Sequence, residues 1–205
     1  MDTCDAKRIL LFLARGFEDY EAVSVLSVCG WTEYRPHIDK VHVVVAGLHE
    51  IVRGRFGLSI PVDLQLEKVN PEDFDALVVP GGFHDHGYDE AYCLPLRELA
   101  KVMHSRGAMI ATMCVGVLPI AEAGLLEGCR ATTYAFSRSH DNFGRLQELG
   151  CEAVHEPVVV SNRIISCSGP AYSMNVIDLL LEDLVGHDAV REIAHFRSGV
   201  SSSRA

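Results

Sequence analysis

The chain has 205 residues, 48% of them hydrophobic, and a formal net charge of −10 at pH 7. A chain of this length can bury one sizeable core, so we expect a single domain over residues 1–205, with its core at about 7–196 and a flexible tail at 197–205. The acidic balance disfavours binding to nucleic acid and to anionic membranes. No apolar run is long enough to span a bilayer, and the first residues lack the pattern of an export signal.

The chain contains seven cysteines. An odd number without any Cys-x-x-Cys pair indicates neither a disulfide framework nor a zinc site. We therefore expect free thiols in a reducing compartment and a cytoplasmic protein.

The first half of the chain alternates apolar strands with helices. Continuous apolar runs are typical of strands buried on both faces of a parallel sheet, and they predict strands at 7–13, 41–46 and 76–79. A helix is expected to follow the glycine turn at Gly16 and to run to about Cys29, because its apolar residues share one face. A second helix is expected at about 93–105.

Two segments of this half have less regular patterns. Residues 31–39 are polar and aromatic, with Pro36 among them, so we expect an inserted loop. Residues 51–62 contain Gly54 and Gly57 among alternating apolar residues, which predicts a small hairpin or an irregular strand pair at the sheet edge.

The second half begins with a strand at 109–113 and a helix at about 116–123, which Gly124 ends. The remaining pattern predicts a short strand at 130–133, a helix at 143–149, a strand hairpin at 158–160 and 164–166, and helices at 169–184 and 188–196. Strands that alternate with helices predict an α/β fold: a flavodoxin-like, doubly wound, mostly parallel sheet with helices on both faces.

Ligands of such folds bind outside the carboxyl ends of the strands. Glu18, Gly82 and Cys114 each follow the carboxyl end of a predicted strand. We therefore expect these three residues to meet in one crevice.

Cys114 falls at the joint between a predicted strand and a predicted helix. Pro119 favours a helix start just after Cys114, because proline is tolerated in the first turn of a helix. The helix dipole and free N–H groups at that end stabilise a thiolate, so we expect the pKa of Cys114 to fall below that of a free cysteine. A strand-turn-helix arrangement of this kind is typical of a catalytic nucleophile.

Each of these residues also has a plain structural interpretation. Cys114 fits equally as a small buried hydrophobic residue, Glu18 as an acid that suits a helix N-terminus, and Gly81-Gly82 as an ordinary tight turn. Composition and spacing leave both interpretations open.

Several motifs together resemble the ThiJ/PfpI family, in the branch of the parkinsonism-associated deglycase and its bacterial chaperone-like relatives. The resemblance covers about residues 7–196, and the motifs agree in order and spacing. They are Gly16–Ala22, Val44–Gly47, Asp63, Pro80–Gly82, Ala111–Gly116 and Ser168–Pro170.

The resemblance implies that Cys114 is the nucleophile and that Glu18 is a protonated acid hydrogen-bonded to the thiolate. It also implies that the N–H groups of Gly82 and Val115 form an anion hole, and that the protein is a homodimer. An acid held neutral by burial can stabilise a thiolate without adding a like charge. No cofactor is implied.

Two positions depart from the family pattern. Protease-like members carry a histidine directly after the nucleophile, where this chain has Val115, so peptidase chemistry is disfavoured. Tyr134 occupies a position that is often histidine in the deglycase branch, and a tyrosine with a reference pKa of ~10 is a poor general base.

Other histidines are candidates for the proton transfer that a histidine in place of Tyr134 would perform. His84 and His86 follow Gly82, and His140 follows Tyr134. Two histidines without a third ligand do not define a metal site, so we expect no metal. His84, His86, Asp85 and Asp89 fit equally as residues of a solvated loop.

Three functions are consistent with these residues. In the first, Cys114 attacks a reactive carbonyl, or its thiol or amine adduct, in glyoxalase or deglycase chemistry, and Glu18 transfers protons. In the second, the same cysteine is an oxidisable sensor in a non-enzymatic or chaperone-like protein. A glutamine amidotransferase-like hydrolase ranks last, because no convincing late His/Glu pair occurs.

Overall fold

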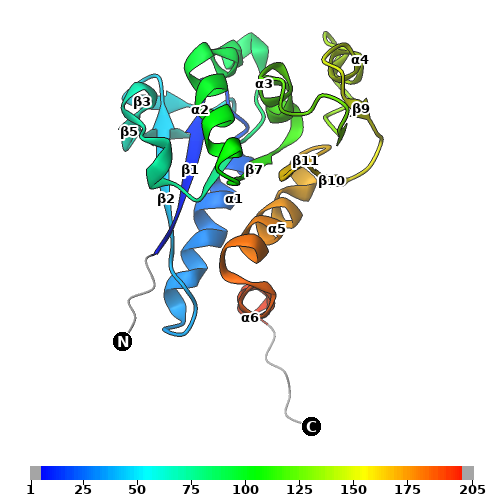
Figure 1. The fold of residues 1–205 in the computed structure, drawn as a ribbon. Coiled ribbons are helices and arrows are strands. Elements are labelled where there is room, and N and C mark those ends of the chain that lie inside the picture. Colours follow the sequence, from blue (N-terminus) through cyan, green and yellow to red (C-terminus); the bar gives the residue numbers. More distant parts are fainter. Residues whose placement is uncertain (1–5, 200–205) are drawn as a thin grey trace.

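A computed structural model describes residues 6–199 (Figure 1). A seven-stranded sheet with the order β10-β11-β7-β6-β1-β2-β5 forms its centre, and only β10 runs antiparallel to its neighbour. The predicted flavodoxin-like α/β fold is thus confirmed. In chain order the strands are β1 (Lys7–Leu13), β2 (Val41–Gly47), β5 (Leu64–Gln65), β6 (Ala76–Val79), β7 (Met109–Thr112), β10 (Val158–Ser161) and β11 (Ile164–Cys167).

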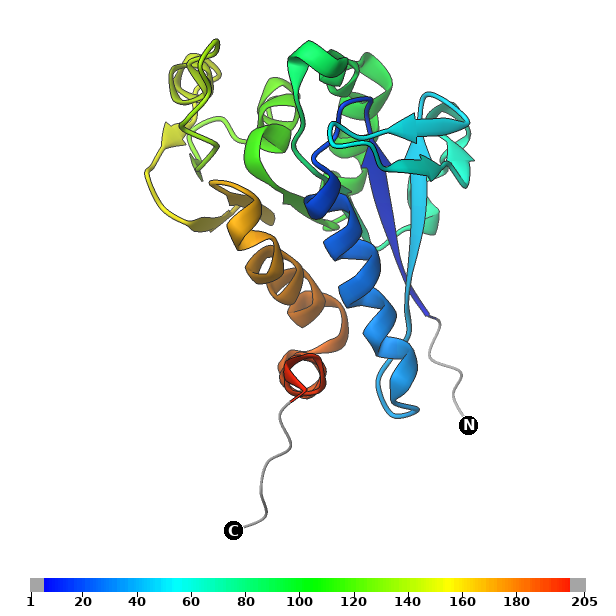
Figure 2. The ribbon, with the colours of Figure 1, turned by 180° about the vertical axis from the view of Figure 1, so that it is seen from behind.

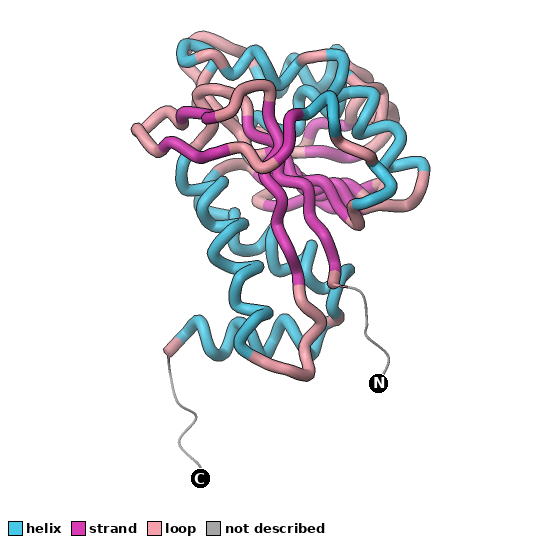
Figure 3. The backbone as a smooth tube through the Cα atoms, turned by 90° about the vertical axis from the view of Figure 1, so that its left-hand side faces the viewer, coloured by secondary structure: helices cyan, strands magenta, loops and turns pink. Residues whose placement is uncertain are grey.

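Helices cover both faces of this sheet, as the side view in Figure 3 shows. One layer contains α1 (Asp19–Gly30) and α5 (Ser173–Val185), with α6 (His187–Ser198) packed against α5. The opposite layer contains α2 (Leu94–Ser105) and α3 (Val117–Glu122), and α4 (Asn142–Glu148) packs against α3.

Strand β1 shows why a continuous apolar run is needed at the centre. Successive side chains of a strand point to opposite faces. Ile9 and Leu11 therefore join the core beneath α1 and α5, whereas Leu10 and Phe12 join the core beneath α2 and α3. All four side chains are buried, so neither face of the strand has room for a polar residue.

The segment predicted as a loop at 31–39 instead begins with a 3-10 helix, Trp31–Tyr34. Thr32 within it is buried, and its hydroxyl donates to Cys29 O (2.8 Å) and accepts from Val41 N (3.1 Å). These two bonds pair a carbonyl group at the end of α1 and an N–H group at the start of β2, so a short helical turn replaces the irregular loop.

The predicted hairpin at 51–62 is present as β3 (Ile51–Arg53) and β4 (Ser59–Pro61). It forms a separate two-stranded sheet, and the edge of the main sheet is the unpredicted strand β5. Figure 2 shows the hairpin, in cyan, beside the N-terminal end of α1. A two-residue strand has no detectable periodicity, so its pairing depends on tertiary structure.

A third small sheet pairs β8 (Arg130–Ala131) with β9 (Glu152–Ala153) in parallel. The strand expected at 130–133 is therefore shorter, and β9 was not predicted. Helix α6 continues to Ser198, so the expected tail does not begin at 197. The rest of that tail and Cys4 lie outside the described residues. Between residues 6 and 199 no helix has the length and apolar character needed to cross a membrane.

Candidate active site

Cys114 lies in a strained turn between a strand and a helix. Strand β7 ends at Thr112, a 3-10 turn spans Cys114–Gly116, and α3 begins at Val117. Cys114 has a φ of 52°, in the left-handed region that non-glycine residues rarely adopt. A nucleophile elbow has this geometry, because the sharp turn holds the side chain out at the end of the sheet.

Two glycines allow the elbow to approach the turn after β6. A Cβ at Gly116 would overlap the Val79 carbonyl oxygen. A Cβ at Gly81 would lie 2.7 Å from the Cys114 Cβ and 3.1 Å from Oε2 of Glu21. The turn at 80–82 therefore fits tightly between the elbow and the first turn of α1.

Glu18 is the N-cap of α1, and its carboxylate accepts a hydrogen bond from the Glu21 N–H (2.7 Å). Its backbone N–H donates to Gly81 O (2.9 Å), while Gly81 N–H donates to Glu21 Oε2 (2.7 Å). Glu21 is fully buried, and its other oxygen, Oε1, has no hydrogen-bond partner among residues 6–199. The start of α1 is thus clamped to the turn after β6.

The implied bond between Glu18 and the Cys114 sulfur is not observed in the described part of the chain. Glu18 instead caps the helix, although it lines the same pocket as Cys114. Burial raises the pKa of Glu18 above its usual value, against two opposing backbone hydrogen bonds. The buried acid next to the elbow is Glu21, whose pKa burial raises to about 8. Glu21 is therefore mainly protonated at neutral pH.

The expectation of a lowered pKa for Cys114 is wrong. Burial raises the pKa of the thiol well above its ordinary value, and the nearby Glu21 carboxyl raises it further once that group ionises. The Val115 N–H faces the sulfur and lowers the pKa, as a helix N-terminus should, but this single donor is outweighed. Cys114 is a neutral thiol in this state, so attack requires a base that removes its proton.

Two backbone N–H groups belong to residues that line the pocket around the elbow. The Val115 N–H points toward the sulfur, and the Gly82 N–H has no hydrogen-bond partner within the described range. The Gly82 backbone is held in place by an antiparallel bridge to Phe17 and by Tyr88, whose hydroxyl donates to Pro80 O beneath the turn. Fixed donors of this kind are suited to hold a developing oxyanion.

All the predicted site residues except His86 line one pocket of about 540 Å³. They converge from the ends of β1, β6 and β7 and from the segment after β8, at the carboxyl edge of the sheet. Their chemical roles stay predictions. The residues are Glu18, Gly82, His84, Cys114, Val115, Tyr134 and His140.

The histidines of this pocket form a connected group. His84 Nδ1 lies 2.7 Å from Asp89 Oδ1, and the rings of His84 and His140 are 4.7 Å apart. His86 does not line the pocket, because its backbone lies against Gly16. Within residues 6–199, no three His, Cys, Asp or Glu side chains are placed to hold a metal ion.

Glu21 is the site residue that sequence reasoning missed. The helical period contained the signal: Glu21 lies four and seven residues before Val25 and Val28, on the buried face of α1. A carboxylate within an apolar face indicates a buried acid.

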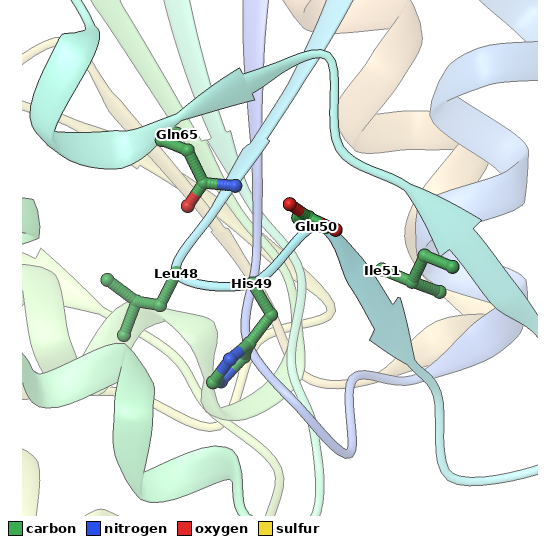
Figure 4. A pocket seen from close by; sticks show the side chains of 5 residues that line it. All are labelled: Leu48, His49, Glu50, Ile51 and Gln65. Atoms are coloured by element: carbon green, nitrogen blue, oxygen red, sulfur yellow. The ribbon is translucent and has the colours of Figure 1, made fainter.

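A second hollow, of about 580 Å³, lies at the turn after β2 (Figure 4). It is lined by Leu48, His49, Glu50, Ile51 and Gln65. His49 is already bound to Glu90 (2.8 Å), and the lining contains no cysteine, serine, threonine or lysine. The candidate active site is therefore the Cys114 pocket.

Comparisons with known proteins agree with this geometry. The sequence model of the DJ-1/PfpI family matches residues 7–183. Deglycase PfpI of Pyrococcus furiosus is 31% identical over 166 residues, which are 80% of this chain and 90% of the relative. Protein DJ-1alpha of Drosophila melanogaster is 28% identical over 196 residues, 94% of this chain and 84% of the relative.

Solved structures of other proteins in this family have the same fold. The crystal structure of Drosophila melanogaster DJ-1beta superposes with a TM-score of 0.80 and 25% identity, covering 96% of this chain and 100% of that one. Toxoplasma gondii DJ-1, in an oxidised form, has a TM-score of 0.78 and 25% identity, covering 93% and 97%. This chain therefore belongs to the DJ-1/PfpI family.

Proposed function

We propose that this protein is a cysteine-dependent enzyme of the glyoxalase or deglycase type, acting on reactive carbonyls or on their thiol and amine adducts. The observation that supports this most directly is the strained Cys114 elbow, which opens into a pocket beside the unpaired Gly82 N–H. Relatives of this chain named deglycase support the same class of chemistry.

In the first step, the Cys114 sulfur bonds to the aldehyde carbon of a 2-oxoaldehyde such as methylglyoxal. The thiol proton passes to the Glu18 carboxylate, whose raised pKa makes it a better base near neutral pH. The electron pair of the carbonyl becomes an oxyanion, which the N–H groups of Gly82 and Val115 stabilise. Glu18 then returns the proton to this oxyanion, and the product of the step is a hemithioacetal.

The hydrogen on the former aldehyde carbon is then removed as a proton, and a proton is returned to the neighbouring carbon. The first carbon is thereby oxidised to a thioester and the second is reduced to an alcohol, so no external oxidant is needed. Water attacks the thioester, the Cys114 sulfur leaves and is reprotonated, and the 2-hydroxy acid is released. Methylglyoxal yields lactate.

The two acids at the start of α1 have different parts in this proposal. Glu18 lines the pocket, and in this proposal it exchanges protons with the thiol or with the substrate oxygen. Glu21 is sealed beneath the Gly81 turn, where its neutral form avoids a negative charge next to the forming oxyanion. Glu21 is thus a positioning residue.

The alternative function, an oxidisable sensor or chaperone-like protein, uses the same cysteine. Peroxide attacks thiolates in preference to thiols, so the raised pKa of Cys114 disfavours rapid oxidation in this state. Mass spectrometry after mild peroxide treatment tests this function. Selective oxidation of Cys114 ahead of the other cysteines would support it.

Lactate formation from methylglyoxal tests the enzymatic proposal. We expect Cys114→Ser to abolish turnover and Glu18→Gln to lower it by about a hundredfold, the usual size of a general acid–base contribution. Cys129→Ser, outside the pocket lining and half-buried, is the matched control and should retain activity. Undiminished lactate formation by Cys114→Ser would refute the proposal.

A further inference from the structure

Two arginines, Arg55 and Arg138, line the Cys114 pocket. Within the described part of the chain, neither guanidinium forms an ion pair with a carboxylate, although the chain has a net charge of −10. The same lining contains two acidic side chains, Glu18 and Asp85. The Glu18 carboxylate is already engaged as the N-cap of α1, where it accepts from the Glu21 N–H (2.7 Å). The pocket therefore offers two free cationic groups to a ligand.

The backbone around Arg55 is fixed against the start of α1. Arg55 N–H donates to Phe17 O (2.9 Å), and the Asp19 carboxylate accepts from the N–H groups of Phe56 (3.0 Å) and Leu58 (2.8 Å). The tip of the β3–β4 hairpin is thereby held at the N-terminal end of α1, where Figure 2 shows it. Arg55 thus extends from an anchored turn.

Aromatic rings lie beside Arg55, and a further one lines the pocket near Arg138 in the sequence. The Arg55 guanidinium carbon lies 5.6 Å from the ring centre of Phe56 and 5.8 Å from that of Phe83, and the two rings meet edge to face. These cation–π contacts orient the guanidinium. Phe136, which is 83% exposed, lines the same pocket from the segment that also carries Arg138. The lining thus combines exposed apolar surface with unpaired positive charge.

We propose that the substrate of Cys114 carries a carboxylate that Arg55 and Arg138 bind, joined to its carbonyl group by an apolar or aromatic body. This inference rests on the proposed function for the role of Cys114 and adds the charge and shape of the substrate. A guanidinium matches a carboxylate in geometry and charge, and the volume of about 540 Å³ suits a small molecule of this kind. The rings of Phe56, Phe83 and Phe136 contact its apolar body.

A probe that cannot turn over separates binding from catalysis. 4-Formylbenzoate carries an aldehyde, an aromatic body and a carboxylate, and 4-formylbenzamide is its neutral counterpart. Either aldehyde adds reversibly to the Cys114 thiol: the sulfur bonds to the carbonyl carbon, and the thiol proton ends on the former carbonyl oxygen. Neither has a second carbonyl next to the aldehyde, so neither proceeds to a hydroxy acid.

Protection of Cys114 from iodoacetamide, followed by mass spectrometry, measures binding of each aldehyde, normalised to its affinity for a free thiol in solution. We expect the carboxylate to protect at about fivefold lower concentration than the amide, which is the scale of two solvent-exposed ion pairs. The preference should disappear in the double variant Arg55→Gln, Arg138→Gln. Arg53→Gln, on the same hairpin but outside the lining, should keep it.

Equal protection by the two aldehydes, or a preference that survives the double substitution, would overturn the inference. Failure of both aldehydes to protect Cys114 would overturn it as well. A retained preference in a protein that forms no lactate would support this inference while removing the proposed function, so the two failures are distinguishable.

Discussion

Oxygen Oε2 of Glu21 accepts a hydrogen bond from the Gly81 N–H at 2.7 Å, and this bond joins the first turn of α1 to the turn after β6. The reverse bond, from Glu18 N–H to Gly81 O, completes the clamp. Gly81 also lies directly against the Cys114 Cβ. The position of the nucleophile elbow therefore depends on the hydrogen bond between Gly81 and Glu21. A buried acid in an α-helix thus determines the geometry of a site that it does not line.

The buried Glu21 makes stability depend on pH. In the unfolded chain this group ionises near 4.5, but in the folded protein it stays protonated up to about 8. Between these values unfolding releases a proton, so the free energy of unfolding falls as pH rises, by about 1.4 kcal/mol per unit and about 5 kcal/mol at most. Glu21→Gln removes this dependence.

Urea denaturation at pH 5, 6.5 and 8 measures the effect. We expect Glu21→Gln to be close to the wild type at pH 5 and more stable than the wild type at pH 8. Glu98→Gln, on the exposed side of α2, is the control and should parallel the wild type. Parallel curves for Glu21→Gln would show that the pKa of Glu21 is not raised.

Gly116 and Gly30 provide a matched pair of glycine-to-alanine substitutions. Both have helical dihedral angles, with φ of −61° and −59°, so alanine is compatible with either backbone. A Cβ at Gly116 meets the backbone of Val79 and Pro80, whereas a Cβ at Gly30 meets nothing within 4 Å. We expect Gly116→Ala to destabilise by about 2–3 kcal/mol and Gly30→Ala to stabilise by about 0.5 kcal/mol, measured by urea denaturation. Equal effects would contradict the close approach at the elbow.

The strain at Cys114 can be measured through substitutions that differ only in Cβ. Its φ of 52° costs a residue with a Cβ about 1–2 kcal/mol relative to glycine. Cys114→Gly should therefore be more stable than Cys114→Ala by about 1 kcal/mol in chemical denaturation. A higher stability of the alanine variant would show that the turn is relaxed.

Much of the fold was predictable because the central strands are buried on both faces. A parallel strand between two helix layers must be apolar at every position, as Lys7–Leu13 is after its first two residues, so such runs are recognisable in the sequence. The two-residue strands β5 and β9 have no such pattern. Their pairing is determined by tertiary contacts, which no local window of sequence contains.

The sequence predicted which segments form the candidate site, but not the protonation of the residues in it. The order of motifs located Cys114, Gly82 and the start of α1, because parallel strands place their carboxyl ends at one edge. Local reasoning could not rank Glu18 against Glu21, which are one helical turn apart. A helix N-terminus alone predicts a lowered pKa for Cys114. Burial raises that pKa by more, and burial depends on tertiary contacts that the local sequence does not contain.

His84 is the group best placed to move a carbon-bound proton in the proposed reaction, because Tyr134 is a poor base. A carboxylate only accepts hydrogen bonds, so the 2.7 Å contact with Asp89 places a proton on Nδ1 of His84 and leaves Nε2 as the ring nitrogen that Asp89 does not engage. His84 lines the Cys114 pocket, whereas Asp89 does not.

We therefore expect His84→Gln to lower kcat for lactate formation by about a hundredfold and Asp89→Asn by about tenfold, with little change in KM. Asp89→Asn should act only when His84 is present, so the double variant should be no slower than His84→Gln alone. His86→Gln, three residues before Asp89 and outside the pocket, is the control and should retain activity. Additive losses in the double variant would show that Asp89 does not act through His84, and an active His84→Gln would assign the proton transfer to another group.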